Sequence, residues 1–136
     1  MKTSTQKAMV ITPDNNPCPP SENEIDVAWI LAYHFKCVVE FIIPLDDYKR
    51  KTPDIIINGR VMEIKTPGGS SRKNTIRNQF DRANKQHVND LVIDGRNTKL
   101  NDQELERGII KELKVRHRIT RVILITKDAK VLVFGK

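Results

Sequence analysis

The segment from Asp54 to Lys65, DIIINGRVMEIK, places Asn-Gly between two apolar runs. Asn-Gly is the strongest short-range signal for a two-residue hairpin turn, because both central residues of that turn need a positive φ. The sequence therefore predicts a β-hairpin that turns at Asn58 and Gly59. Such a loop would pair Asp54 directly with Glu63, and the alternation of side chains along a strand would place Lys65 on the same face as Glu63.

The charged residues of this hairpin have two interpretations. In the first, Lys65 neutralises Glu63 on a solvated face, as exposed charges commonly do. In the second, the strands are too apolar for a solvated face, and the like charges of Asp54 and Glu63 need a compensating cation. Their carboxylates and the backbone carbonyl of Ile64 are hard oxygen ligands, which Mg²⁺ or Mn²⁺ prefers. We favour this second interpretation, in which Lys65 acts beside the metal on a phosphodiester.

The hairpin lies within an alternation of helical and strand patterns. Ser21 and Glu24 form a capping-box pattern before a helix that is apolar nearly all round and should bury Trp29. Helical spacing of apolar residues predicts two further helices, and β-branched runs predict strands on both sides of them. The expected helices lie at 22–35, about 71–86 and about 105–113, and the expected strands outside the hairpin at 37–43, 90–94, 121–126 and 130–134. This order predicts an α/β fold of the α+β kind, a mixed sheet with helices on its faces.

Length and composition indicate one domain. A chain of 136 residues can bury a single core without disulfides. Residues 1–20 are rich in Pro and Asn and predict an extended arm, with a short strand at Met9 to Ile11, before a domain at 21–136. Cys18 and Cys37 lack metal-ligand spacing and are interpreted as free thiols. No stretch approaches the roughly 20 apolar residues of a membrane span.

The charge of the chain points to a polyanionic partner. The sequence has 24 Lys and Arg against 17 Asp and Glu, a net charge of +7. An excess of positive charge favours the approach of phosphates, so nucleic acid is the expected partner. The helix predicted at about 71–86 carries the cations nearest to the end of the hairpin. The residues expected to contact phosphates are Arg72, Lys73, Arg77 and Lys85.

The hairpin also carries a family resemblance. TPDIIINGRVMEIK resembles the PD-(D/E)xK nuclease signature, an aspartate at the start of one strand and E-x-K at the end of the next. The resemblance implies a restriction-endonuclease-like α-β-β-β-α-β core, here with a further helix and two C-terminal strands, and catalytic roles for Asp54, Glu63 and Lys65. It also implies a first-helix glutamate, which would be Glu24. The capping box explains Glu24 equally well, and Glu22 or Asp26 could be the matching acid instead.

The flanks of the hairpin narrow this resemblance. SENEIDVAWILA, TPGGSSRKNTIRNQFDRANKQ and VILITKDAKVLVF are similar to the C-terminal toxin domains of contact-dependent growth inhibition and related polymorphic toxin systems, many of which cleave tRNA. This similarity implies an RNase toxin that acts in the bacterial cytoplasm after delivery as the end of a larger secreted toxin, and an immunity protein, which we expect to be acidic. The alternatives are a DNA endonuclease of the restriction or resolvase type and a non-catalytic nucleic-acid-binding module.

Overall fold

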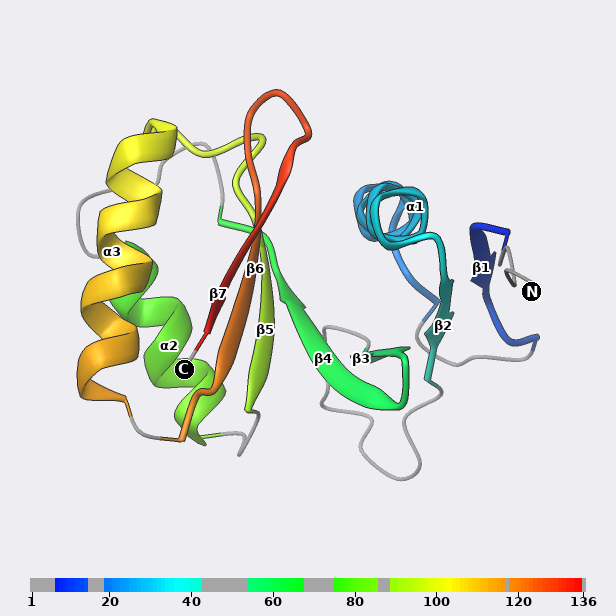
Figure 1. Ribbon diagram of the computed structural model, residues 1–136, viewed down its shortest axis with the longest axis horizontal. Helices are drawn as coiled ribbons and strands as arrows, with labels where there is room; N and C mark the ends of the chain where they lie inside the picture. Colours follow the sequence, from blue (N-terminus) through cyan, green and yellow to red (C-terminus); the bar gives the residue numbers. More distant parts are fainter. Residues whose placement is uncertain are drawn as a thin grey trace, which may run out of the picture. The chain divides into compact units, whose positions relative to one another are not determined.

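The computed structural model describes residues 7–14, 19–42, 54–67, 75–85, 89–116 and 118–135. The side chains of Asp54, Thr75 and residues 82–85 lie outside this description. The described residues form seven strands and three helices (Figure 1): β1 (Met9–Ile11), α1 (Glu22–Phe35), β2 (Val38–Phe41), β3 (Asp54–Ile57), β4 (Arg60–Lys65), α2 (Thr75–Lys85), β5 (Asp90–Asp94), α3 (Asp102–Val115), β6 (Arg121–Ile125) and β7 (Val131–Gly135). The predicted mixed α/β fold is confirmed.

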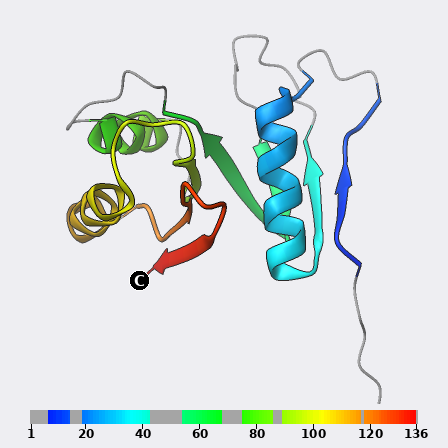
Figure 2. The same cartoon turned by 90° about the horizontal axis from the view of Figure 1, so that it is seen from above.

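The chain divides into two compact units, Met1–Val61 and Met62–Lys136. In the first unit, β1 pairs parallel with β2, and β2 pairs antiparallel with β3. Helix α1 lies against β1 and β2 (Figure 2). The short strand predicted at Met9 to Ile11 is therefore confirmed, whereas the boundary proposed after residue 20 stays a prediction.

The first helix is buried on one side and not all round. Its buried side consists of small and aliphatic residues, and two aromatic residues are exposed, Trp29 by 36% and Tyr33 by 67%. Their rings lie beside each other, with centroids 5.6 Å apart. The prediction that Trp29 is buried is wrong, because the apolar sequence of α1 exceeds the one side that meets the strands. The buried side is Val27, Ala28, Leu31 and Ala32.

The second unit is a helix layer on a four-strand arrangement. Strand β4 pairs parallel with β5, β5 parallel with β6, and β6 antiparallel with β7. Helices α2 and α3 lie together on one side of β5, β6 and β7 (Figure 1). Their apolar residues meet those of the strands in one core, which confirms the periodicity on which both helices were predicted. That core includes Ile76, Phe80, Leu91, Ile93, Leu105, Ile109, Leu113, Val122 and Leu124.

The hairpin turn has the predicted conformation. Strand β3 ends at Ile57 and β4 begins at Arg60, so the loop contains two residues. Asn58 has φ 51° and Gly59 has φ 80°. Positive φ at both central residues defines the type I′ turn that Asn-Gly favours, because its twist matches that of the flanking strands.

No helix in the described part of the chain is long and apolar enough to span a membrane.

Candidate active site

Strand β4 carries charged side chains in a buried setting. The four residues from Met62 to Lys65 are all buried, although two of them are charged. The register pairs Glu63 with Leu91 and Lys65 with Ile93 on β5. Side chains of directly partnered residues point to the same side of a sheet. Glu63 and Lys65 therefore lie on the face whose β5 residues belong to the core under α2 and α3.

Glu63 and Lys65 form a buried ion pair. Lys65 Nζ donates to Glu63 Oε1 at 2.8 Å. Glu63 is 3% exposed and Lys65 is 6% exposed. The predicted common face is confirmed, and so is the neutralisation of Glu63 by Lys65. The solvated face of the first interpretation is wrong, because both charged side chains are almost completely buried.

The metal site stays a prediction. Asp54 is the first residue of β3, but its side chain lies outside the described part of the chain. Among the side chains that the structure describes, no three His, Cys, Asp or Glu residues are grouped as metal ligands. The predicted ligand atoms, carboxylate and carbonyl oxygens, are of the type that a hard cation such as Mg²⁺ prefers.

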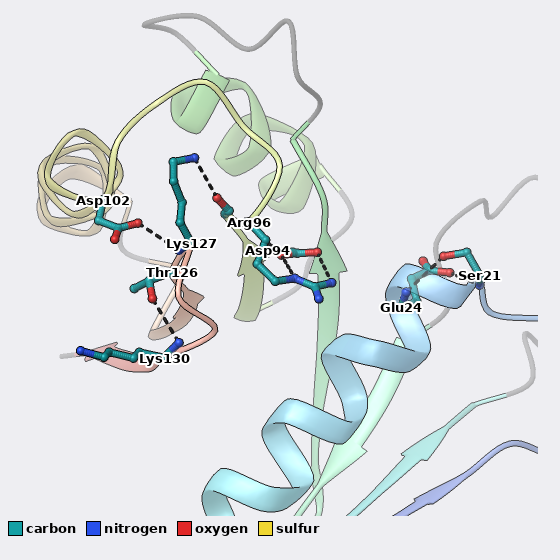
Figure 3. Close-up of polar contacts among 9 residues, drawn as sticks. Ser21, Glu24, Asp94, Arg96, Asp102, Thr126, Lys127 and Lys130 are labelled. Atoms are coloured by element: carbon teal, nitrogen blue, oxygen red, sulfur yellow. Dashed lines mark hydrogen bonds and ion pairs between the residues drawn. The ribbon is translucent and has the colours of Figure 1, made fainter.

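Glu24 belongs to a complete capping box at the start of α1 (Figure 3). Its Oε1 accepts from the backbone N–H of Ser21 at 2.7 Å, and Ser21 Oγ accepts from the backbone N–H of Glu24 at 3.2 Å. Both bonds satisfy amides that the helix itself leaves without partners. The capping role is confirmed, and the catalytic role stays a prediction. The alternative acids, Glu22 and Asp26, are exposed on the same helix.

The basic residues predicted to contact phosphates are only partly described. Arg77 is exposed on α2, whose Ile76 and Phe80 are buried in the core and fix the orientation of the helix. Lys85 is the last residue of α2, and its side chain lies outside the described part of the chain, as do Arg72 and Lys73 altogether. The amphipathic helix with an exposed cation is thus confirmed for Arg77.

A second buried carboxylate was not predicted. Asp94 ends β5 and is fully buried, and Arg96 holds it through Nε at 2.8 Å, Nη2 at 3.0 Å and its backbone N–H at 3.1 Å (Figure 3). Asp94 follows Ile93, which pairs with Lys65, the last residue of β4. Arg96 therefore lies where β4 and β5 both end. An acid that closes an apolar strand two residues before an arginine is the signal that could have indicated it.

A lysine fixes the loop that contains Arg96. The ammonium of Lys127 donates to the carbonyl of Thr98 and, at 3.4 Å, to that of Gly95. The backbone N–H of Lys127 donates to Asp102 at 3.2 Å, which ties the β6–β7 turn to the start of α3. The two bonds from the Lys127 ammonium join residues that are distant in the sequence and hold Gly95 and Thr98, on either side of Arg96, beside the end of β5.

Comparisons with known proteins show the family and the fold of the chain. A family profile described as the contact-dependent growth inhibition CdiA C-terminal domain matches residues 51–131, which include the hairpin, α2 and α3. A solved structure titled "CdiA-CT/CdiI toxin and immunity complex from Burkholderia pseudomallei" is similar in fold, with a TM-score of 0.66 at 15% identity over 94% of this chain and 99% of that chain. A search of curated proteins gives no significant match. The matched residues span more than half of the sequence, so the chain belongs to the family of CdiA C-terminal domains, the toxin domains of contact-dependent growth inhibition.

Proposed function

We propose that this toxin domain is a divalent-metal-dependent endonuclease, with tRNA as its preferred substrate. The observation that carries the proposal is the buried Glu63–Lys65 pair on β4, 2.8 Å apart, within a strand that ends in E-x-K. Burying two charges is unfavourable unless the geometry is excellent, and an apolar pair of similar size would usually be at least as stable. The pair is therefore better explained by chemistry than by stability.

The ligands of the proposed metal are Asp54, Glu63 and the backbone carbonyl of Ile64. Two carboxylates and a carbonyl match the preference of Mg²⁺ or Mn²⁺ for oxygen ligands, and the ion would keep several waters. When bound, such an ion lowers the pKa of water and neutralises negative charge on a phosphate. Supporting this assignment, the Glu63 carboxylate is held in one place by its bond to Lys65.

Lys65 has two proposed roles. Its ammonium is fixed by Glu63, so it can orient an attacking water and donate a hydrogen bond to the scissile phosphate without being reorganised during the reaction. An ammonium in a water-poor setting stabilises developing negative charge more strongly than one in bulk water. Glu24 stays a candidate fourth catalytic residue.

The substrate is proposed from the charge of the chain and from its family. Arg77 on α2, with Arg72, Lys73 and Lys85 near it in sequence, would contact the phosphate backbone. Such contacts give affinity that decreases as salt rises. The preference for tRNA over DNA rests on the resemblance to tRNA-cleaving toxins, and action in the cytoplasm of the target bacterium follows from that substrate.

Incubation with total tRNA and with plasmid, side by side, tests the proposal. We expect cleavage of tRNA with Mg²⁺ or Mn²⁺, no cleavage with chelator, and intact plasmid. Asp54→Ala and Glu63→Gln should each abolish cleavage. Cut plasmid with intact tRNA would establish a DNA endonuclease instead. Equal binding of RNA with and without metal, and no product, would establish a non-catalytic binding module.

A matched control for Glu63→Gln exists in α3. Glu112 is also a buried glutamate, 6% exposed, and pairs with Arg116 Nε at 3.0 Å. Glu112→Gln removes the same charge from a similar setting that has no E-x-K pattern. We expect it to retain cleavage, and loss of cleavage in both variants would mean that Glu63→Gln acts through folding and not through the site.

The same proposal includes an inhibitor. A toxin requires protection of the cell that produces it. The similar solved structure is titled a toxin and immunity complex. We propose an immunity protein with an acidic surface, since carboxylates placed where phosphates would bind can block cationic side chains. Expression of the wild-type domain alone should impair bacterial growth, and Asp54→Ala should relieve that defect. A growth defect that persists in Asp54→Ala would contradict a toxic role for the nuclease.

A further inference from the structure

The edge strand β7 and helix α3 form a groove that the proposed nuclease does not use. The groove has a volume of about 490 Å³ and is lined by Ile110, Leu113, Lys114, Val133, Phe134 and Gly135. Ile110 is 43% exposed and Val133 is 51% exposed, so apolar side chains face solvent on both sides of it. All of the lining residues belong to the second unit.

Strand β7 lies at the edge of the sheet. It pairs with β6 and, within the described residues, with no other strand. Its sequence VLVFG contains no proline and no charged residue. Proteins normally protect such edges with charges, proline or bulges, because the unpaired N–H and C=O groups bind a further strand. An apolar groove beside an open edge is the arrangement used in strand addition, where backbone bonds give affinity and the groove receives alternate side chains.

The charge beside the groove indicates the occupant. The half of α3 from Arg107 to Val115 has the sequence RGIIKELKV, and its three cations, Arg107, Lys111 and Lys114, are all exposed. Its single acid, Glu112, is buried and paired with Arg116. Pairing of β7 with β7 of a second copy would bring two such cationic half-helices together, in chains of net charge +7 each. An acidic partner meets no such repulsion.

We propose that an extended segment of the acidic immunity protein adds a strand to β7 and places an acidic side chain beside Lys114. The segment would alternate apolar residues, which enter the groove against Ile110 and Phe134, with polar ones. This inference rests on the inhibitor of the proposed function but assigns a contact surface separate from the phosphate-binding side of α2. The immunity protein would therefore hold the toxin through backbone pairing as well as through charge.

Hydrogen exchange and binding measurements with the purified immunity protein of the producing strain test the inference. The backbone amides of Val131–Gly135 should exchange at least about tenfold more slowly in the complex than in the free chain. Lys114→Glu and Ile110→Asp should each raise the Kd by about tenfold or more. The matched controls are Lys99→Glu and Val115→Asp, which make the same charge changes at exposed positions of the second unit outside the groove lining.

The outcomes separate this inference from the proposed function. The controls should change the Kd by less than about threefold, and all four variants should cleave tRNA as the wild type does when no immunity protein is present. A complex in which β7 amides exchange as in the free chain would overturn strand addition, as would unchanged binding by Lys114→Glu and Ile110→Asp. A dimer of the chain alone, with β7 amides already protected, would assign the edge to a second copy. The absence of any complex would refute the inhibitor and this contact together, while the cleavage assay would still decide the nuclease.

Discussion

Replacement of Lys65 by methionine tests directly how the buried charges of β4 are stabilised. Glu63 is 3% exposed and its cationic partner 6% exposed, so neither charge is well hydrated in the folded chain. Methionine keeps most of the volume of lysine and removes its charge. The loss of one partner of a buried pair typically lowers the free energy of unfolding by about 3–5 kcal/mol, because the other charge is left uncompensated. This is a large part of the roughly 5–15 kcal/mol that stabilises a domain.

The double variant Glu63→Gln/Lys65→Met isolates the charge effect. It removes both charges at nearly constant volume, so the uncompensated carboxylate of the single variant is gone. We expect its free energy of unfolding to lie within about 1–2 kcal/mol of the wild type, on either side, because replacing a buried pair with uncharged side chains is often neutral or stabilising. The Glu63→Gln single variant completes a double-mutant cycle with these two variants. The coupling energy between Glu63 and Lys65 should be about 2 kcal/mol or more, at the upper end for residues in contact.

Urea denaturation in chelator provides the measurement. Lys111→Met is a matched control, since Lys111 is an exposed lysine on α3, and it should change the free energy of unfolding by less than about 0.5 kcal/mol. If Lys65→Met also falls within about 1 kcal/mol of the wild type, the pair is solvated and the argument from burial to function fails. If the single variant does not fold, recovery of folding in the double variant still tests the charge effect.

Addition of Mg²⁺ extends the test to the proposed metal. In Lys65→Met the carboxylate of Glu63 lacks its 2.8 Å cation, so a divalent ion at the site should stabilise this variant. Binding to the folded state alone contributes about 1.4 kcal/mol when free Mg²⁺ is about ten times its Kd. The double variant lacks the Glu63 carboxylate and should respond less. An equal response in both variants would place Mg²⁺ elsewhere on the chain.

Three further predictions concern the turn, the cap and the buried thiol. Gly59→Ala should lower the free energy of unfolding by about 1 kcal/mol or more, measured in urea, because alanine is strained at φ 80°. Ser21→Ala should lower the free energy of unfolding by about 1 kcal/mol through loss of the α1 cap. Glu24→Gln keeps an acceptor for the Ser21 N–H. Loss of tRNA cleavage in Glu24→Gln alone would therefore assign a catalytic role to Glu24. Burial raises the pKa of the Cys37 thiol. The stability that the neutral thiol contributes is therefore complete below the ordinary thiol pKa and is lost as pH rises through the raised value. Between about pH 7 and 10, the urea midpoint should therefore decrease less in Cys37→Ala than in the wild type.

The elements that the sequence predicted well are those whose local signals agree with their packing. Asn58-Gly59 required a turn with two positive φ values, and the structure has φ 51° and 80°. Helix α3 was predicted from Leu105, Ile109 and Leu113, and all three are buried in the core. In both cases a short-range pattern and the tertiary environment select the same conformation, so the pattern alone is sufficient.

The misjudged features depend on what covers each face. The composition of α1 indicated burial all round, but only contact with strands decides which residues of an apolar helix are covered, and Trp29 is 36% exposed. The burial of Asp94 is equally non-local in its cause, because Asp94 pairs with Ile125 on β6 and ends a strand that lies between β4 and β6. No periodicity along the chain reports that a strand is central in its sheet.

The charged residues of β4 were predictable for a different reason. The sequence RVMEIK places Glu63 and Lys65 on one face whatever the rest of the chain does, and the apolar content of β4 and β5 then implies their burial. The similar solved fold, at 15% identity, supports the architecture and does not assign the chemistry, since one fold can carry many activities. The inference to a nuclease therefore depends on this pair in this chain. An ion pair at 3% and 6% exposure is a local conflict with core packing, and such conflicts are expected where a residue is kept for function and not for stability.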